Sequence, residues 1–284
     1  MVDLNIKIPE GFLDEEVRCG YTVSRQMKEV WAVELDLLDQ LLRVCAKYNL
    51  KCYADAGTLM GAVRHHGFIP WDDDIDVAMF RPDYDKLLEV AQDEFKEPYH
   101  FQSAYTEEEY HTGHGQLRNS QTTAILKRSI GLGRTFNQGI FLDIFILDGV
   151  PDSEQKLNLL KRKVQFVKKI RLRFVHRNQT IYRKLFSIED NCLRKSSVDS
   201  CNLVAPLSFK FETEKRIRNK HIYDETVLMP FEFIEIPIPA GYDEFLTRRY
   251  GNYMEPKQVS TTHGGTIFDT DKSYVEYLKA SSEK

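Results

Sequence analysis

The sequence has little cysteine, and no arrangement of it that suits a disulfide framework or a zinc site. Only five of the 284 residues are cysteine, an odd number without a Cys-x-x-Cys pair. Thiols scattered in this way are expected to be reduced and mostly buried. The five positions are Cys19, Cys45, Cys52, Cys192 and Cys201.

Long apolar runs are also absent. No stretch approaches the roughly 18 uninterrupted apolar residues that a membrane-spanning helix needs. The first residues show no basic segment followed by an apolar one, so we expect no signal peptide. There is no internal repeat and no low-complexity segment either. These absences predict a cytoplasmic protein.

Charge of neither sign dominates. The formal net charge is -4, from 39 basic and 43 acidic residues, which gives no reason to expect a nucleic-acid partner. A hydrophobic content of 42% and an aromatic content of 12% are typical of a folded globular protein.

Periodicity of apolar residues predicts the secondary structure. Spacings of three and four from Met27 to Cys45 place apolar residues on one face of a helix over residues 23–48. Strands are expected over residues 51–56, 75–80, 99–104, 116–126, 140–147 and 235–238. Further helices are expected over residues 58–64, 82–95, 153–196, 243–250 and 272–280. The prediction is an α+β chain: a mixed sheet flanked by helices over residues 1–150, then a mainly helical part over residues 151–284, or one continuous domain.

The candidate chemistry begins with the acidic run Asp72-Asp73-Asp74-Ile75-Asp76. On a strand, residues two apart point to the same side, so Asp74 and Asp76 would project together. Such neighbouring carboxylates raise each other's pKa unless a cation lies between them. Their oxygens suit Mg²⁺ or Mn²⁺.

Asp143 lies inside the apolar run Ile140–Leu147, where an acid without a partner would be costly to bury. A metal shared with Asp74 and Asp76 would explain it, since carboxylates from two strands can hold two divalent ions about 4 Å apart. The alternative partner is a core arginine.

Other interpretations of these residues stay open. The run Asp72–Asp76 could be a solvated acidic loop. It also resembles the start of an EF-hand loop, but Val77 replaces the glycine and Asp83 the glutamate of that motif. His65 and His66 could be metal ligands, yet adjacent histidines rarely reach one site, so substrate contact or exposure is expected.

A glycine-containing turn upstream predicts a phosphate site. Gly57 and Thr58 begin a short predicted helix, where free N–H groups and the hydroxyl can bind phosphate oxygens. Gly61 and Arg64 follow in the same segment, and the arginine could neutralise developing charge.

The segment Ala56–Asp85, which reads AGTLMGAVRHHGFIPWDDDIDVAMFRPDYD, closely resembles the signature of the LicD family. The resemblance extends over roughly residues 25–265. It includes the segments Gly139–Asp148, Ile236–Pro239, Tyr242–Leu246 and Tyr250–Met254, with Pro256. It implies a nucleotidyltransferase-like fold related to fukutin-type proteins. The glycine-serine pair common in that superfamily is Gly57-Thr58 here, which keeps the hydroxyl.

The resemblance implies transfer of phosphocholine from CDP-choline to a sugar hydroxyl of a cell-surface glycan precursor, of the teichoic acid or lipooligosaccharide type. CMP would be released, with Mg²⁺ or Mn²⁺ as cofactor and two ions expected. The alternatives are transfer of another phospho-alcohol, for example from CDP-ribitol, nucleotidyl transfer on the same scaffold, and a module that only binds nucleotide.

The expected roles of the site residues follow from this activity. Metal ligands and catalytic residues would be Asp74, Asp76 and Asp143, with help from Asp72. Substrate-binding residues would be Gly57, Thr58, Gly61, Arg64 and Trp71. Asp143 is also the candidate general base. Trp71 or Tyr53 could contact the quaternary ammonium of choline, with core packing as the alternative for each.

Residues 156–184 contain eleven lysine and arginine residues and no acidic one, with an apolar stripe from Leu159 to Phe174. A basic amphipathic helix can lie on an anionic membrane surface. By analogy with the family the acceptor is lipid-linked, which predicts peripheral contact at the inner membrane face. A solvated basic face on a packed helix is the alternative.

Overall fold

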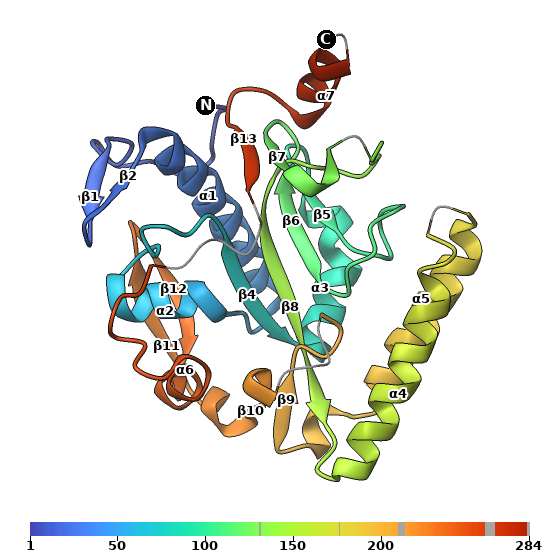
Figure 1. Ribbon diagram of the computed structural model, residues 1–284. Helices are drawn as coiled ribbons and strands as arrows, with labels where there is room; N and C mark the ends of the chain where they lie inside the picture. Colours follow the sequence, from blue (N-terminus) through green and yellow to red (C-terminus); the bar gives the residue numbers. More distant parts are fainter. Residues whose placement is uncertain (131, 176, 210–213, 259–264, 283–284) are drawn as a thin grey trace.

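The computed structural model describes residues 1–130, 132–175, 177–209, 214–258 and 265–282 (Figure 1). The described α-helices are α1 (Arg25–Tyr48), α2 (Ala56–His65), α3 (Arg81–Glu94), α4 (Glu154–Arg171), α5 (Gln179–Arg194), α6 (Tyr242–Tyr250) and α7 (Tyr274–Ser282). The strands are β1 (Glu16–Arg18), β2 (Tyr21–Val23), β3 (Tyr53–Ala54), β4 (Ile75–Phe80), β5 (Tyr99–Gln102), β6 (Gly115–Asn119), β7 (Thr123–Leu126), β8 (Ile140–Val150), β9 (Leu203–Ala205), β10 (Arg218–Asn219), β11 (Thr226–Phe231), β12 (Ile234–Pro239) and β13 (Thr266–Asp269).

The central strand of the main sheet is β8, which is buried along its whole length. β4 pairs with it in parallel on one edge, while β6 and β9 pair antiparallel with its two ends on the other edge. β3, β5 and β10 extend the sheet beyond β4, β6 and β9. A strand covered on both faces is expected to be apolar almost throughout, which accounts for the run containing Asp143.

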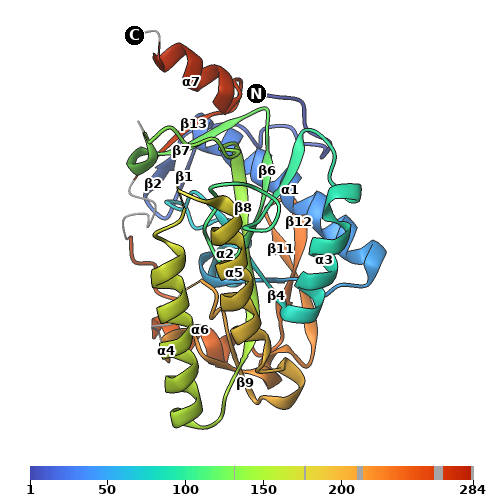
Figure 2. The same ribbon diagram turned by 90° about the vertical axis from the view of Figure 1, so that its right-hand side faces the viewer.

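The long helix α1 begins where the Ser24 side chain accepts a hydrogen bond from the Met27 N–H. It ends at Asn49, which adopts the left-handed conformation with φ 54°. Its buried stripe, with Trp31 and Leu35, joins the core over the sheet. Figure 2 shows α1 and α3 on one side of the sheet, with α4 and α6 on the other.

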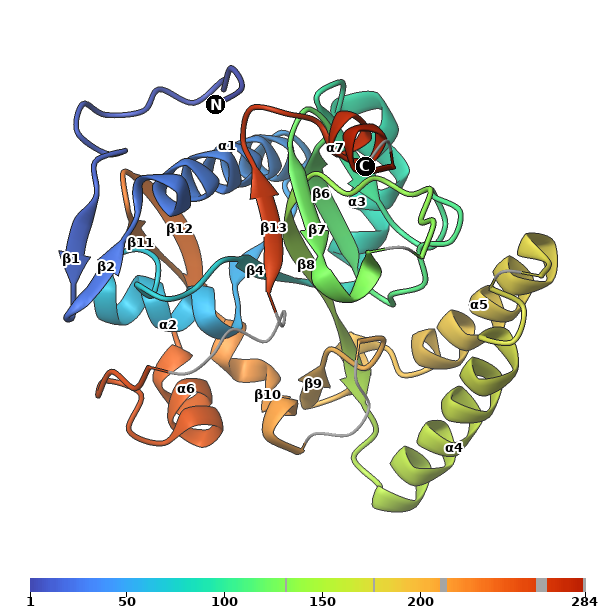
Figure 3. The ribbon, with the colours of Figure 1, turned by 45° about the horizontal axis from the view of Figure 1, so that its top comes forward.

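Helices α4 and α5 form an antiparallel pair, the α4–α5 arm (Glu154–Arg194), which stands beside the sheet (Figure 3). Arg81, at the start of α3, joins the arm to the sheet. Its guanidinium donates to Asp148 of β8 and to Asp190 of α5, both at 2.8 Å. Burial raises the pKa of Asp148 to about 6 although Arg81 opposes the shift.

The structure corrects several sequence predictions. The strand expected over residues 116–126 is two strands, because the chain turns at Ser120 and β7 pairs with distant β13. The helical stretch 153–196 is two helices, because Asn178 caps the start of α5. The second part, predicted as mainly helical with one strand at residues 235–238, contains that strand as β12 and also supplies β9, β10, β11 and β13, of which β9 and β10 join the main sheet. Division of the chain at residue 150 stays a prediction.

Among the described residues, no helix is both long and apolar enough to cross a membrane. The five cysteines are free thiols, and Cys45, Cys52 and Cys201 are buried.

Candidate active site

The parallel pairing of β4 and β8 brings the predicted carboxylates together. Asp76 lies directly opposite Asp143 in the register, and residues paired in this way point to the same face of a sheet. Asp74 precedes Asp76 by two positions and shares that side. Gln116 of β6 lies opposite Asp143 on the other edge of β8. Strand register thus brings together Asp76 and Asp143, which are 67 positions apart in the sequence.

These residues line a cavity of about 400 Å³. Its acidic lining residues are Asp55, Asp72, Asp74, Asp76, Asp143 and Glu255. Basic side chains also line it, namely Arg64, Arg216, Arg249 and Lys257. Aromatic lining comes from Trp71, Phe145, Phe209, Tyr250 and Tyr253. The acidic run therefore borders a pocket and is not a solvated loop.

The carboxylates are close enough to perturb one another. Burial first, and then the charges of Asp74 and Asp143, raise the pKa of Asp76 well above its usual range. Carboxylate oxygens of Asp72, Asp73 and Asp74 lie within 4.8 Å of one another. A cluster of hard oxygen ligands at this density fits a divalent cation such as Mg²⁺. Asp73, which is buried, was not among the predicted ligands.

A buried glutamate on α1 adds to the acidic surroundings. Glu34 has one carboxylate oxygen without a hydrogen-bond partner. Burial, followed by the charges of Asp74 and Asp73, raises the pKa of Glu34 well above its usual range. No sequence motif marks Glu34, which only interrupts the apolar face of a helix.

Asp143 is held in a fixed orientation by neighbouring side chains. Its Oδ1 contacts His114 Nε2 at 3.1 Å and accepts a hydrogen bond from Gln116 Nε2 at 2.6 Å. Arg118 in turn donates to Gln116 Oε1 at 2.6 Å and to the Gly139 carbonyl oxygen. His114 and Gln116 were missed by sequence analysis, since only pairing of β6 with β8 brings them to the site.

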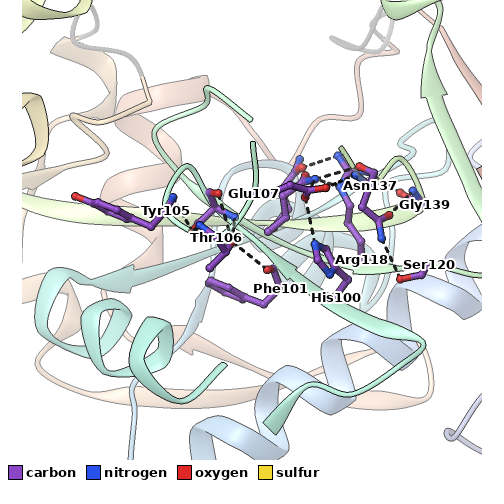
Figure 4. A network of polar contacts seen from close by, with 12 residues as sticks. His100, Phe101, Tyr105, Thr106, Glu107, Arg118, Ser120, Asn137 and Gly139 are labelled. Carbon is purple, nitrogen blue, oxygen red and sulfur yellow. Dashed lines mark hydrogen bonds and ion pairs between the residues drawn. The ribbon is translucent and has the colours of Figure 1, made fainter. Parts of the chain in front are cut away.

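The same arginine belongs to a larger polar network beside the sheet (Figure 4). Glu107 accepts hydrogen bonds from Gln102 and from the Asn137 N–H. Burial acts against ionisation, but contacts with His100, Gln102 and Asn137 lower the pKa of Glu107. Because Arg118 also donates to Gln102, the network supports the residues that hold Asp143.

The residues of the predicted phosphate-binding turn have roles in the packing of the fold. A Cβ at Gly57 would lie 2.7 Å from an Asp72 oxygen, and one at Gly61 would lie 2.4 Å from the Gly67 carbonyl oxygen. Thr58 Oγ1 accepts a hydrogen bond from the Asp76 N–H at 2.8 Å. Gly57 lines the cavity, whereas Thr58 and Gly61 are not among its lining residues. Phosphate binding by these residues stays a prediction.

Arg64 and Trp71 reach the cavity as expected, and Tyr53 does not. Arg64 Nη1 donates to the Tyr253 carbonyl oxygen at 2.5 Å. The Trp71 ring meets Tyr21 edge-on. Tyr53 is buried against Phe80 and Tyr223. Its predicted contact with the quaternary ammonium of choline is therefore wrong, and the alternative, packing in the core, is correct.

Of the two histidines, His66 is exposed as expected, whereas His65 is half-buried against Arg64. His66 is exposed in the left-handed position that ends α2, with φ 54°. His65 accepts a hydrogen bond from Arg64, and burial together with that cation lowers the pKa of His65 to about 4. Neither lines the cavity.

Carboxylates gathered on paired strands beside a helix start and several cations are typical of enzymes that transfer phosphorus-containing groups. Residues 49–130 match the family described as LicD/FKTN/FKRP, nucleotidyltransferase domain. The chain is 30% identical over 257 residues to the lipopolysaccharide cholinephosphotransferase LicD of Haemophilus influenzae, covering 84% of this chain and 95% of that protein. The chain therefore belongs to the LicD family and is a transferase, which confirms the resemblance.

Shorter matches cover part of the chain. An uncharacterised protein of Rickettsia prowazekii is 39% identical over 54 residues, which is 19% of this chain and 20% of that protein. One of Rickettsia typhi is 43% identical over 47 residues, 16% of this chain and 15% of that protein.

Proposed function

We propose that the protein transfers phosphocholine from CDP-choline to a sugar hydroxyl of a cell-surface glycan precursor, of the lipopolysaccharide or teichoic acid type. The main support is a cavity with acidic and basic sides in a chain similar over 84% of its length to a cholinephosphotransferase. Aromatic rings of Trp71, Tyr250 and Tyr253 line the same cavity and suit a quaternary ammonium group.

The proposed cofactor is Mg²⁺ or Mn²⁺, with two ions expected. Asp74, Asp76 and Asp143 would hold it, assisted by Asp72. When bound, a divalent ion supplies electrostatic stabilisation of the charge on the transferring phosphoryl group.

The reaction can be written from the residues of the chain. The acceptor hydroxyl oxygen forms a bond to the phosphorus that carries choline, and its proton passes to a carboxylate, with Asp143 as the proposed base. The bond from that phosphorus to the bridging oxygen breaks, and its electron pair leaves with CMP. Contacts from His114 and Gln116 keep the Asp143 carboxylate directed during the proton transfer.

A panel of donors tests this function. The purified chain would be incubated with Mg²⁺, candidate glycans, and CDP-choline, CDP-ribitol or CTP. We expect CMP release from CDP-choline together with a gain of one phosphocholine in acceptor mass, and loss of both on chelation. Turnover of CDP-ribitol alone would overturn the choline assignment, and release of diphosphate from CTP would indicate nucleotidyl transfer.

We also propose that the α4–α5 arm contacts the inner face of an anionic membrane, as a peripheral association of a cytoplasmic enzyme. Phe166 and Leu159 are 66% and 53% exposed on α4. Arg162 and Lys169 lie four and three positions from Phe166 and share its side of the helix. Aromatic and basic residues exposed together suit a lipid surface.

After its first turn, the arm exposes no carboxylate among the residues that the structure describes. The two acids in this stretch are Glu189 and Asp190, both buried. Glu189 pairs with Arg171, and Asp190 with Arg81 and Arg194. Beyond Glu154 in its first turn, the exposed charge in the described part of the arm is therefore entirely positive.

Vesicle flotation tests the contact. Each basic residue near an anionic bilayer contributes about 1 kcal/mol. The double change Arg162→Glu and Lys169→Glu is therefore expected to weaken binding to phosphatidylglycerol vesicles by tenfold or more. The matched control is Lys86→Glu on α3, which should bind like the unaltered protein. Equal binding to neutral phosphatidylcholine vesicles, or none to anionic ones, would contradict the membrane contact.

A further inference from the structure

Two arginines from distant parts of the chain meet at the cavity. Arg216 belongs to the short 3-10 turn Glu214–Arg216, and Arg249 lies in the last turn of α6. Both line the cavity that also contains Asp55 and Asp76. The sequence interval between them gives no motif, so only the fold reveals the pair.

These cations differ from three buried arginines that are neutralised by carboxylates. Arg81, Arg171 and Arg218 each form an ion pair with a carboxylate. Neither Arg216 nor Arg249 has a carboxylate within 4.0 Å in the ranges that the structure describes. Their charge is thus not neutralised by a direct ion pair there.

Aromatic rings support both guanidinium groups. Arg216 lies 4.8 Å from the ring centre of Phe209. Arg249 lies 4.9 Å from that of Tyr250 and 5.7 Å from that of Phe245. A guanidinium resting on a ring is held by its flat face, while the N–H groups at its edge can still bind two anion oxygens.

The two charges also act on each other. Burial first, and then the charge of Arg249, lower the pKa of Arg216, while the charges of Asp55 and Asp76 oppose the shift. Because no carboxylate lies at ion-pair distance from either guanidinium in the described ranges, an anion that binds to both would relieve the repulsion between them. The two arginines line the same cavity as the acidic cluster, which fits a divalent ion. Two positive charges together with such an ion are complementary to a diphosphate.

We propose that Arg216 and Arg249 form a binding site for the diphosphate of the donor nucleotide and so select nucleoside diphosphate esters over monophosphates. The identity of the donor as CDP-choline rests on the proposed function, whereas the diphosphate class rests on the two arginines. In the proposed reaction their N–H groups donate to the bridging oxygen as its electron pair passes to CMP. The product, with one phosphate fewer, is held by fewer contacts.

Calorimetric titration of the full chain with CDP and with CMP, both in Mg²⁺, tests the site. We expect CDP to bind at least tenfold more tightly than CMP. Arg249→Ala and Arg216→Ala should each weaken CDP binding by about tenfold or more while changing CMP binding much less. Arg249→Lys should recover part of the loss, because the charge returns without the paired N–H groups.

Arg248→Ala is the matched control, because Arg248 is the neighbour of Arg249 on α6 but is exposed and does not line the cavity. It should bind CDP like the unaltered chain. Thermal unfolding of every variant identifies any loss of fold, and Arg249→Gln, which keeps most of the side chain, replaces a variant that unfolds. An equal loss of CDP and CMP binding, or the same loss in Arg248→Ala, would overturn the site.

The outcome separates this site from the proposed function. Arginine-dependent binding of CDP without turnover of CDP-choline would leave the diphosphate site standing and refute the donor. Turnover of CDP-choline with unchanged kcat/KM in both alanine variants would refute the site and leave the donor standing.

Discussion

Replacing Asp76 by asparagine is expected to lower the rate of phosphocholine transfer by on the order of a thousandfold, since a metal-stabilised transition state depends on several kcal/mol of charge stabilisation. Asp76 on β4 lies opposite Asp143 on β8. The variant keeps the shape of the side chain and the backbone hydrogen bond to Thr58. Steady-state kinetics at saturating Mg²⁺ would measure the loss.

The same variant should not lose stability. Burial and neighbouring charges raise the pKa of Asp76 in the folded state. A group whose folded pKa is raised stabilises the fold below its unfolded pKa, and this contribution is lost as pH rises through the folded value. At neutral pH without metal, Asp76→Asn should therefore unfold at an equal or higher temperature than the original chain.

The control for Asp76→Asn is Asp93→Asn, an exposed acid on α3, which should change neither rate nor stability. Asp143→Asn should behave like Asp76→Asn. A nearly unaltered rate for Asp76→Asn at saturating Mg²⁺, or unchanged metal dependence for Asp143→Asn, would show that these carboxylates do not form the metal site.

Arg218→Ala is expected to destabilise the protein by about 3–5 kcal/mol, because it leaves a buried carboxylate without its cation. Arg218 donates two hydrogen bonds to Asp55, at 2.6 and 3.0 Å, and both residues are buried. Its guanidinium also rests 4.1 Å from the Phe245 ring centre. Urea unfolding at pH 7 would give the change in free energy.

The matched control is Arg43→Ala, which breaks the exposed pair of Arg43 with Asp39 on α1 and should cost less than about 1 kcal/mol. Although burial acts against ionisation, Arg218 keeps the pKa of Asp55 below its usual range. The stabilisation from Asp55 is therefore present above its unfolded pKa and lost as pH falls. A cost for Arg218→Ala equal to that of the control would mean that the pair does not stabilise the fold.

Local pattern was sufficient for the parts of the fold with strong periodicity. The strand over residues 75–80 and the long first helix lie where they were predicted. The short strands β9 and β10 could not be predicted, because they are three and two residues long and are defined by pairing with remote partners. The break at Ser120 likewise depends on β7 leaving the main sheet for β13.

The candidate site likewise contains residues that could be predicted from the sequence and residues that could not. The acidic residues Asp74, Asp76 and Asp143 could be selected because charge within apolar strands is costly and their spacing sets their direction. The partners that hold or complement them come from elsewhere in the chain. Sheet register places Gln116 opposite Asp143, and His114, just before β6, contacts the same carboxylate. Arg216 and Arg249 line the same cavity only in the folded chain.

Arg81 has a consequence for acceptor choice. Arg81, the first residue after β4, forms buried ion pairs with Asp148 of β8 and Asp190 of α5, so the arm is joined directly to β4 and β8. If the arm rests on lipid, the cavity stands at a set height above the bilayer. Acceptors would then be sorted by reach as well as by sugar chemistry, since a hydroxyl too near the lipid, or on too short a glycan, could not enter.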